Sequence, residues 1–268
     1  MRGISRTSLA EVTQRLDAIL PSADAAALGH ELFEVVSLLG AESSLRRWLA
    51  DQANPAEAKS QLIGELLESK VSPSTVLVVG DIVRAKWSRA RDLVDATERL
   101  AVYATVASAG AGGLDGLEDE LFRFERIVEA QPELRAALTL DGVDGAHKRT
   151  LLEELLSGKV SAPSLALVTE AVVRPRGRTL EQGLEHYQQL VADRAQHFIA
   201  VVRTATPLSD AQQERLRQVL TRSYGRPIHL NIEVVPEFVG GLSIRVGDEV
   251  IDGSVAGRLA EVRRRLAG

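Results

Sequence analysis

The sequence predicts a mainly α-helical protein: two tandem helical bundles followed by a small α+β domain. Three observations predict this fold class. Apolar residues recur at helical spacing from residue 5 to residue 195. Two stretches of that region match each other at a constant offset. After residue 198, apolar and polar side chains alternate, which is typical of strands with one buried face. We therefore expect domains at residues 1–105, 106–195 and 196–268.

The first 110 residues are predicted to form successive amphipathic helices. Pro21 closes the first helix, and Asn54-Pro55 and Ser72-Pro73 each join a capping residue to a proline suited to a first helical turn. A long helix follows from about residue 88 to 109, and Gly110 to Gly116 form a break. The apolar stripes are Leu9, Val12, Leu16 and Ile19; Leu28, Leu32, Val35, Val36 and Leu39; Leu45, Trp48 and Leu49; Ala58, Leu62 and Leu66; Val76, Val79 and Val83; and Leu93, Leu100 and Tyr103.

The helical region contains an internal repeat with an offset of 89 residues. Residues 31–89 and 120–178 share 18 identities in 59 positions without a gap. Chance matching in a chain this rich in Ala and Leu would give roughly 5. The match includes Glu31-Leu32-Phe33 with Glu120-Leu121-Phe122, and Lys70-Val71-Ser72 with Lys159-Val160-Ser161. We interpret it as a duplication in which the long helix ending at Ala109 also supplies the first helix of the second copy.

The C-terminal region is predicted to run strand, helix, strand, strand, short strand, helix. Ser209 and Gln212 have the spacing of a capping box at the start of the first helix. Gly240-Gly241 permit a turn that residues with a Cβ would resist, and Asp252-Gly253-Ser254 cap the final helix. The alternating strand residues are Ile228, Leu230, Ile232 and Val234, then Leu242, Ile244 and Val246; the final helix presents Val255, Leu259, Val262 and Leu266.

Composition excludes several classes of function. The chain has no cysteine, which excludes disulfides, thiolate metal sites and thiol nucleophiles. A net charge of −5 argues against nucleic acid as the main partner. No apolar run is long enough to cross a bilayer, and residues 1–20 lack a signal-peptide core, so we expect no direct membrane insertion.

No motif predicts catalysis, a cofactor or a metal. The five histidines lack ligand spacing. The glycine-rich stretch 109–113 follows a helix rather than a strand, so a linker is favoured over a phosphate loop. Residues 145–150 lack the glycine and lysine order of a P-loop. Asp252-Gly253-Ser254 is explained as a helix cap. Arg174-Pro175-Arg176-Gly177-Arg178 is interpreted as a solvated turn, with an acidic partner surface as the alternative.

A family resemblance rests on the C-terminal motifs. The run Thr206-Pro207-Leu208-Ser209, the helix after it, and the segment VGGLSIRVGDEVIDGSV from Val239 to Val255 resemble the end of the delta subunit of the F-type ATP synthase. That subunit is the bacterial counterpart of the mitochondrial oligomycin-sensitivity conferral protein. The resemblance extends from about Tyr103 onward. An ordinary family member has one helical bundle, and the first copy in this chain is a departure from that pattern.

The resemblance implies a mechanical role in the peripheral stalk, or stator. Delta subunits bind the N-terminal helices of the alpha subunits through the helical domain and the stalk b subunit through the C-terminal domain. They couple proton-driven rotation to ATP synthesis, in a complex whose head is expected at the cytoplasmic face of the cell membrane. By this resemblance the head-binding groove is placed on the first and fifth helices of the second copy, at Tyr103, Val106, Leu165 and Val168. The same places in the first copy hold Leu16, Val76 and Val79.

Two other classes of function stay open from the residues alone. A helical-repeat scaffold unrelated to rotary machinery would share the helices and the duplication, but it would not need the ordered segment from Gly240 to Val255. An enzyme would need a perturbed acid or base in a cleft, and the sequence proposes none.

Overall fold

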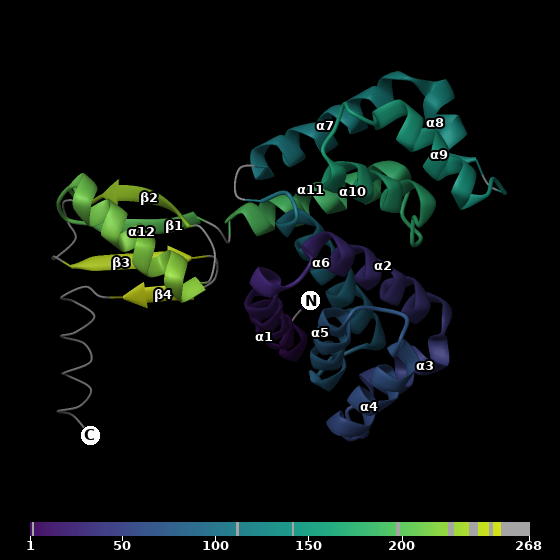
Figure 1. The fold of residues 1–268 in the computed structure, drawn as a ribbon, viewed down its shortest axis with the longest axis horizontal. Helices are drawn as coiled ribbons and strands as arrows, with labels where there is room; N and C mark the ends of the chain where they lie inside the picture. Colours follow the sequence, from purple (N-terminus) through teal and green to yellow (C-terminus); the bar gives the residue numbers. More distant parts are fainter. Residues whose placement is uncertain are drawn as a thin grey trace. The chain divides into compact units, whose positions relative to one another are not determined.

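The computed structural model describes residues 1, 3–110, 113–140, 142–196, 199–224, 228–235, 241–246 and 249–252. The chain forms two compact units, Met1–Ala192 and Asp193–Gly268, which we call the helical unit and the sheet unit. The described residues of the helical unit form helices and the connections between them, and the sheet unit contains a four-stranded sheet (Figure 1). The predicted fold class, mainly α with a small α+β C-terminal part, is confirmed.

The helices follow the same 89-residue offset as the sequence identities. Adding 89 to the bounds of α2, α3, α4 and α5 gives the bounds of α7, α8, α9 and α10. Shifted in the same way, α1 overlaps α6, so α6 is both the last helix of the first copy and the first helix of the second. The helices are α1 (Ile4–Ile19), α2 (Ala25–Ala41), α3 (Ser43–Ala50), α4 (Ala56–Leu67), α5 (Pro73–Arg84), α6 (Ala90–Ala107), α7 (Leu114–Ala130), α8 (Pro132–Thr139), α9 (Gly145–Leu156), α10 (Ala162–Val173) and α11 (Leu180–Gln196), with a 3₁₀ turn at Leu20–Ser22.

The two copies start their fifth helices with the same hydrogen bonds. The Glu31 carboxylate accepts bonds from the Ser72 backbone N–H at 2.9 Å and from the Ser72 hydroxyl at 2.6 Å. Glu120 accepts the equivalent bonds from Ser161 at 2.9 and 2.7 Å. Burial by itself raises the pKa of each carboxyl. The hydrogen bonds from Ser72 and Thr75 to Glu31, and those from Ser164 and Ser161 to Glu120, outweigh it and hold both pKa values below their ordinary range. The second helix of each copy is thereby tied to the cap of the fifth.

Ser69, just past the end of α4, has a backbone conformation that favours glycine. Its φ is 61°, and the equivalent residue of the second copy is Gly158, with φ 70°. A side chain with a Cβ is strained in this left-handed region. We expect Ser69→Gly to raise the free energy of unfolding by about 1 kcal/mol, because the left-handed conformation costs a residue with a Cβ about 1–2 kcal/mol and the greater freedom of unfolded glycine offsets part of this gain. Gly158→Ala should lower the free energy of unfolding by a similar amount. Chemical denaturation of both variants checks this, and a destabilising Ser69→Gly would contradict it.

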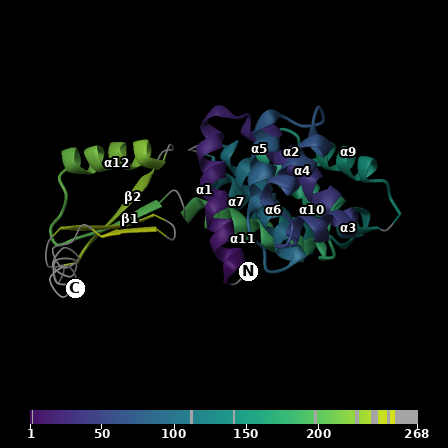
Figure 2. The same ribbon diagram turned by 90° about the horizontal axis from the view of Figure 1, so that it is seen from below.

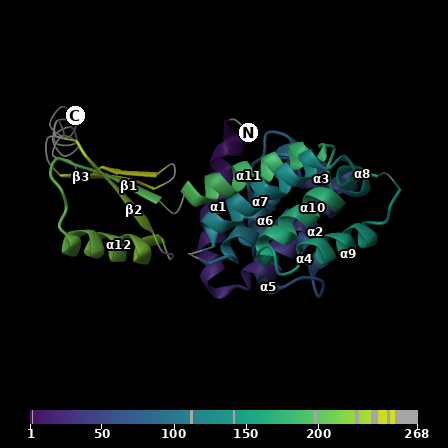
Figure 3. The same cartoon turned by 90° about the horizontal axis from the view of Figure 1, so that it is seen from above.

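A single hydrophobic core runs through the helical unit. Its buried side chains extend from Val12 in α1 to Val191 in α11, without a division between the copies. The central element is α6, which lies in the interior of the unit in Figures 2 and 3 and packs along α2. The crossing is close at Gly29, where a Cβ would lie 2.4 Å from the Thr105 hydroxyl oxygen and 2.9 Å from the Thr105 backbone nitrogen. Only a residue without a side chain allows α2 this near to α6.

The sheet unit follows the predicted order of elements over its described residues. Its elements are β1 (Ile199–Thr204), α12 (Asp210–Tyr224), β2 (His229–Val234), β3 (Leu242–Val246) and β4 (Glu249–Asp252). The sheet order is β2-β1-β3-β4, with β1 parallel to β2 and the other pairs antiparallel. One face of the sheet is covered by α12 (Figures 2 and 3). The buried core of this unit is Ala200, Val202, Leu220, Ile228, Ile244 and Val246.

Of the predicted caps and turns of the sheet unit, some lie within the described residues and others lie outside them. The capping box is confirmed: the Gln212 side chain accepts from the Ser209 backbone N–H at 2.8 Å, and Ser209 Oγ accepts from the Gln212 backbone N–H at 3.3 Å. Gly241 has a φ of 85°, where glycine is favoured. Asp252 pairs with Ser243 at the end of β4. Gly240, Gly253, Ser254 and the predicted final helix lie outside the described residues.

Candidate functional site

The residues predicted to line a partner groove lie on α6 and α10, which contact each other. Tyr103, Val106 and Val168 are buried in the core of the helical unit, and Leu165 is partly buried. A helix that docks on this pair can therefore reach Leu165 directly. It reaches the other three only if neighbouring side chains move. The groove placement stays a prediction.

The equivalent helix pair of the first copy, α1 and α5, exposes a large apolar side chain where the pair α6 and α10 has an alanine. Leu16 and Val79 are buried, Val76 is partly buried, and Leu77 is 60% exposed. An ion pair between Arg15 on α1 and Asp81 on α5, at 2.8 Å, spans the two helices. In the second copy, Ala166 stands where Leu77 stands in the first, so the two helix pairs offer different surfaces.

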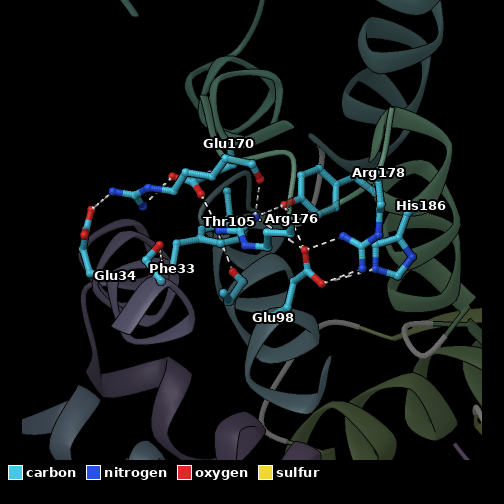
Figure 4. A network of polar contacts seen from close by, with 12 residues as sticks. Phe33, Glu34, Glu98, Thr105, Glu170, Arg176, Arg178 and His186 are labelled. Carbon is cyan, nitrogen blue, oxygen red and sulfur yellow. Dashed lines mark hydrogen bonds and ion pairs between the residues drawn. The ribbon is translucent and has the colours of Figure 1, made fainter. Parts of the chain in front are cut away.

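The arginine cluster between α10 and α11 is not the solvated turn that the sequence predicts. Figure 4 shows the side chains of Arg176 and Arg178 directed at carboxylates of the same chain. Arg174 pairs with Glu34 on α2 at 2.5 Å and with Glu170 on α10 at 3.1 Å. Arg176 pairs with Glu170 at 2.8 Å. The acidic surface that the cluster binds is thus supplied partly by the first copy of the repeat.

Glu98 on α6 is the centre of this network and is only 2% exposed. Its two carboxylate oxygens accept from the two terminal nitrogens of Arg178, at 2.8 and 2.9 Å. The Tyr187 hydroxyl donates to the same carboxylate at 3.2 Å and accepts from Arg176 at 2.8 Å. His186 Nε2 lies 3.7 Å from Glu98. A bidentate hydrogen bond between an arginine and a carboxylate is among the strongest polar contacts in proteins.

The charge states follow from this geometry. Burial alone would raise the pKa of Glu98, but the hydrogen bond and charge of Arg178, helped by Arg176, lower it below its ordinary value. Burial also lowers the pKa of His186, with the charge of Arg178 acting in the same direction. At neutral pH the carboxylate is therefore ionised and held by arginines. A carboxylate stabilised in this way is a poor proton donor and suits a structural role.

Aromatic contacts join the same elements. The rings of Phe33 on α2 and Tyr187 on α11 lie 6.1 Å apart, and the Arg176 guanidinium lies 5.4 Å from the centre of the Phe33 ring. The polar network and these contacts together fasten α2 of the first copy to α10 and α11 of the second. We call the set Phe33, Glu34, Glu98, Glu170, Arg174, Arg176, Arg178, His186 and Tyr187 the junction network.

Sequence reasoning found the arginines of the junction network but missed their carboxylates. One signal was available at Glu98, because its neighbours at helical spacing include the apolar residues Val94, Ala101 and Val102. Within the described ranges, His, Asp and Glu side chains form no group of three that could hold a metal ion. No helix in the part of the chain that the structure describes is both long and apolar enough to cross a membrane.

Comparison with known proteins identifies the family. The family model described as "ATP synthase delta (OSCP) subunit" matches residues 99–266, from within α6 to near the end of the chain. An ATP synthase subunit delta of Thermobifida fusca is 72% identical, with 100% of both chains covered. One of Streptomyces avermitilis is 51% identical over 99% of this chain and 98% of the relative.

A solved structure of the Toxoplasma gondii mitochondrial ATP synthase hexamer contains a chain that is 20% identical. The match covers 62% of this chain and 95% of that one, with a TM-score of 0.33. The family model and the full-length relatives confirm the resemblance read from Thr206 to Val255. The chain belongs to the ATP synthase delta (OSCP) subunit family and is a non-catalytic subunit of the ATP synthase peripheral stalk.

Proposed function

We propose that this chain ties the catalytic head of an ATP synthase to the stalk b subunit, at the cytoplasmic face of the cell membrane. The helical unit grips the N-terminal helices of the alpha subunits, and the sheet unit grips stalk b. In domain terms, residues 1–105 and 106–195 are duplicated bundles and residues 196–268 bind the stalk. Because both ends are held at once, a partial release of one grip is followed by rebinding at high local concentration.

The observation that carries this proposal is the way the two bundles are joined. A stator transmits torque, so a joint between its parts must resist bending. Here the joint combines one continuous apolar core with a buried carboxylate, that of Glu98, whose two oxygens both bind Arg178. Close-packed interiors have low compressibility and transmit strain. The extra bundle therefore lengthens the adaptor without adding a hinge.

The head contact belongs on a first-helix and fifth-helix pair, and the two copies offer two such pairs. The pair α6 and α10 carries Tyr103, Val106, Leu165 and Val168, of which Leu165 is the accessible member. The pair α1 and α5 presents Leu77 at 60% exposure. Exposed apolar area drives docking of an amphipathic helix. This favours the first copy as the site where an alpha-subunit helix binds in the folded chain.

Calorimetric titration with a synthetic peptide from the N-terminus of the same organism's alpha subunit tests the placement. Leu77→Asp and Leu165→Asp are matched variants on the fifth helices of the two copies. We expect Leu77→Asp to weaken binding by about 10-fold or more, because a buried leucine contributes about 1.5–3 kcal/mol. We expect Leu165→Asp to bind as the unmodified chain does.

The reverse result would move the head contact to the second copy and keep the function. If the unmodified chain did not bind the peptide at all, the proposed grip on the alpha subunit would be wrong. Because Leu77 is largely exposed, its variant should keep the thermal transition of the unmodified chain, and that measurement separates lost binding from lost folding.

A further inference from the structure

Equivalent phenylalanines of the two copies have opposite environments. Phe33 on α2 and Phe122 on α7 stand 89 residues apart, within the matched triplets Glu-Leu-Phe. Phe33 is 2% exposed and Phe122 is 53% exposed. The duplicated unit thus carries an aromatic side chain at this place twice, and only the first is covered within the described chain.

The side chains that pack on Phe33 show which chemical groups bind this face of α2. An arginine guanidinium, that of Arg176, lies 5.4 Å from the Phe33 ring centre, and the ring of Tyr187 lies 6.1 Å from it. The same guanidinium pairs with the Glu170 carboxylate. The face of α2 around Phe33 is therefore an interface within the chain, formed by a ring, a guanidinium over it and a carboxylate beside them. An arginine in this setting is stabilised both by the cation–π contact with the ring and by the ion pair with the carboxylate.

The rim of Phe122 is acidic, unlike the rim of Phe33. Residues three, four and seven positions away share one face of a helix. Around Phe33 the nearest of those positions hold Gly29, His30, Val36 and Ser37, none of which is a carboxylate. Around Phe122 they hold carboxylates, and the acidic face consists of Glu118, Asp119, Phe122, Glu125 and Glu129, with Arg126 as its one basic member.

The carboxylates of this face have exposed or uncharged partners within the chain. Asp119 pairs with Arg123 and Glu129 with Arg126, both on α7 itself and both exposed. Glu125 accepts a bond from Gln188 of α11 at 2.7 Å, which holds it beside that helix. Such exposed pairs along one helix contribute little and exchange readily for a better partner. A desolvated arginine over the ring would be such a partner.

We propose that the acidic face of α7 around Phe122 docks an arginine-bearing segment of another subunit of the same complex. The arginine lies over the Phe122 ring, as Arg176 lies over Phe33, and pairs with the surrounding carboxylates. The inference rests on the proposed function, because it needs neighbouring subunits. It adds a contact on the second helix of the second copy, a helix that belongs to neither first-helix and fifth-helix pair.

Site-specific photocrosslinking in the purified, assembled ATP synthase tests this surface. Benzoylphenylalanine replaces Phe122 in one preparation and Ile127 in a second. Ile127 is a matched control because it lies on α7 with 47% exposure but points to a different side of the helix. We expect crosslinking at position 122 to be several times more frequent than at 127. Mass spectrometry should place the crosslink next to an arginine in the sequence of another subunit.

Each other outcome overturns part of the proposal. Equal crosslinking at 122 and 127, or none at 122, would show that the acidic face docks nothing. A crosslink to a segment without a neighbouring arginine would overturn the proposed partner chemistry. If the chain failed to copurify with the head and stalk, the proposed function itself would fall. Copurification without the crosslink would count against this inference alone.

Discussion

Glu98→Gln is expected to lower the free energy of unfolding of the helical unit by about 2–4 kcal/mol. Removing one member of a buried ion pair leaves its partners with an uncompensated charge, which costs about 3–5 kcal/mol when burial is complete. Arg178 and Arg176 keep some access to water, with 21% and 16% of their side chains exposed, so we expect the lower part of that range. Chemical denaturation of the full chain, followed by circular dichroism, measures the change.

Two controls separate the network from a general loss of charge. Glu11→Gln alters an exposed carboxylate of α1 and should leave stability within about 0.5 kcal/mol. The double variant Glu98→Leu with Arg178→Met should recover part of the loss, because apolar replacement of a whole buried pair is often neutral. If the double variant were less stable than Glu98→Gln, the idea of an uncompensated charge would be wrong.

The Glu98 effect should depend on pH in a known direction. The pKa of Glu98 is lower in the folded chain than in the unfolded chain, so its contribution is complete above the unfolded pKa. It is lost as the pH falls from there through the folded pKa. The difference in stability between the unmodified chain and Glu98→Gln should therefore be constant near neutrality and shrink in acid. A difference that grew in acid would contradict the assigned charge state.

Gly29→Ala is the second large effect that we expect, a loss of about 2 kcal/mol. Alanine is favoured over glycine inside a helix by about 1 kcal/mol. At Gly29, however, the new methyl group would lie 2.9 Å from the Thr105 backbone nitrogen and 3.1 Å from its Cα, and backbone atoms of a packed helix cannot rotate away. Overpacking of this kind costs about 1–3 kcal/mol or more, which exceeds the gain in propensity.

Gly64→Ala is the matched control because Gly64 lies inside α4, where an added Cβ would meet no atom within 4 Å apart from its chain neighbours and the nearby backbone of its own helix. There the helix propensity acts alone, and stability should rise by up to about 1 kcal/mol. Thermal denaturation of the two variants should move their midpoints in opposite directions. A stabilised Gly29→Ala would show that α2 can move away from α6 without cost, and that the crossing at Thr105 is not tight.

The helices, their caps and the strand order could be predicted because they depend on local chemistry. The spacing of apolar residues sets the helix or strand period, and Ser72, Ser161 and Ser209 satisfy backbone groups within their own turns. The offset of 89 residues indicated that α6 belongs to both copies. It did not indicate which side chains α6 would bury, because a helix shared by two bundles is covered on more than one face.

The partners of side chains far apart in the sequence could not be predicted in the same way. Arg174, Arg176 and Arg178 form a hydrophilic run that looks solvated, yet their carboxylates come from α2, α6 and α10. The helical spacing of Tyr103, Val106 and Val168 predicts that they line a groove. In the folded chain, however, all three side chains are buried, the first two on α6 and the third on α10. A period identifies a face of a helix, and it says nothing about what covers that face.

The family, the mainly helical class with its small sheet, and the repeat could all be predicted from the amino-acid sequence alone. Each of these follows from the order and spacing of residues along the chain. The tertiary structure decided that the two copies share one core, that Glu98 holds the arginine cluster, and that Phe33 is covered while Phe122 is exposed. The physical reason is that burial and ion pairing depend on which helices meet across the fold. Residues 80 or more positions apart in the sequence, such as Glu98 and Arg178, carry no mark of their pairing.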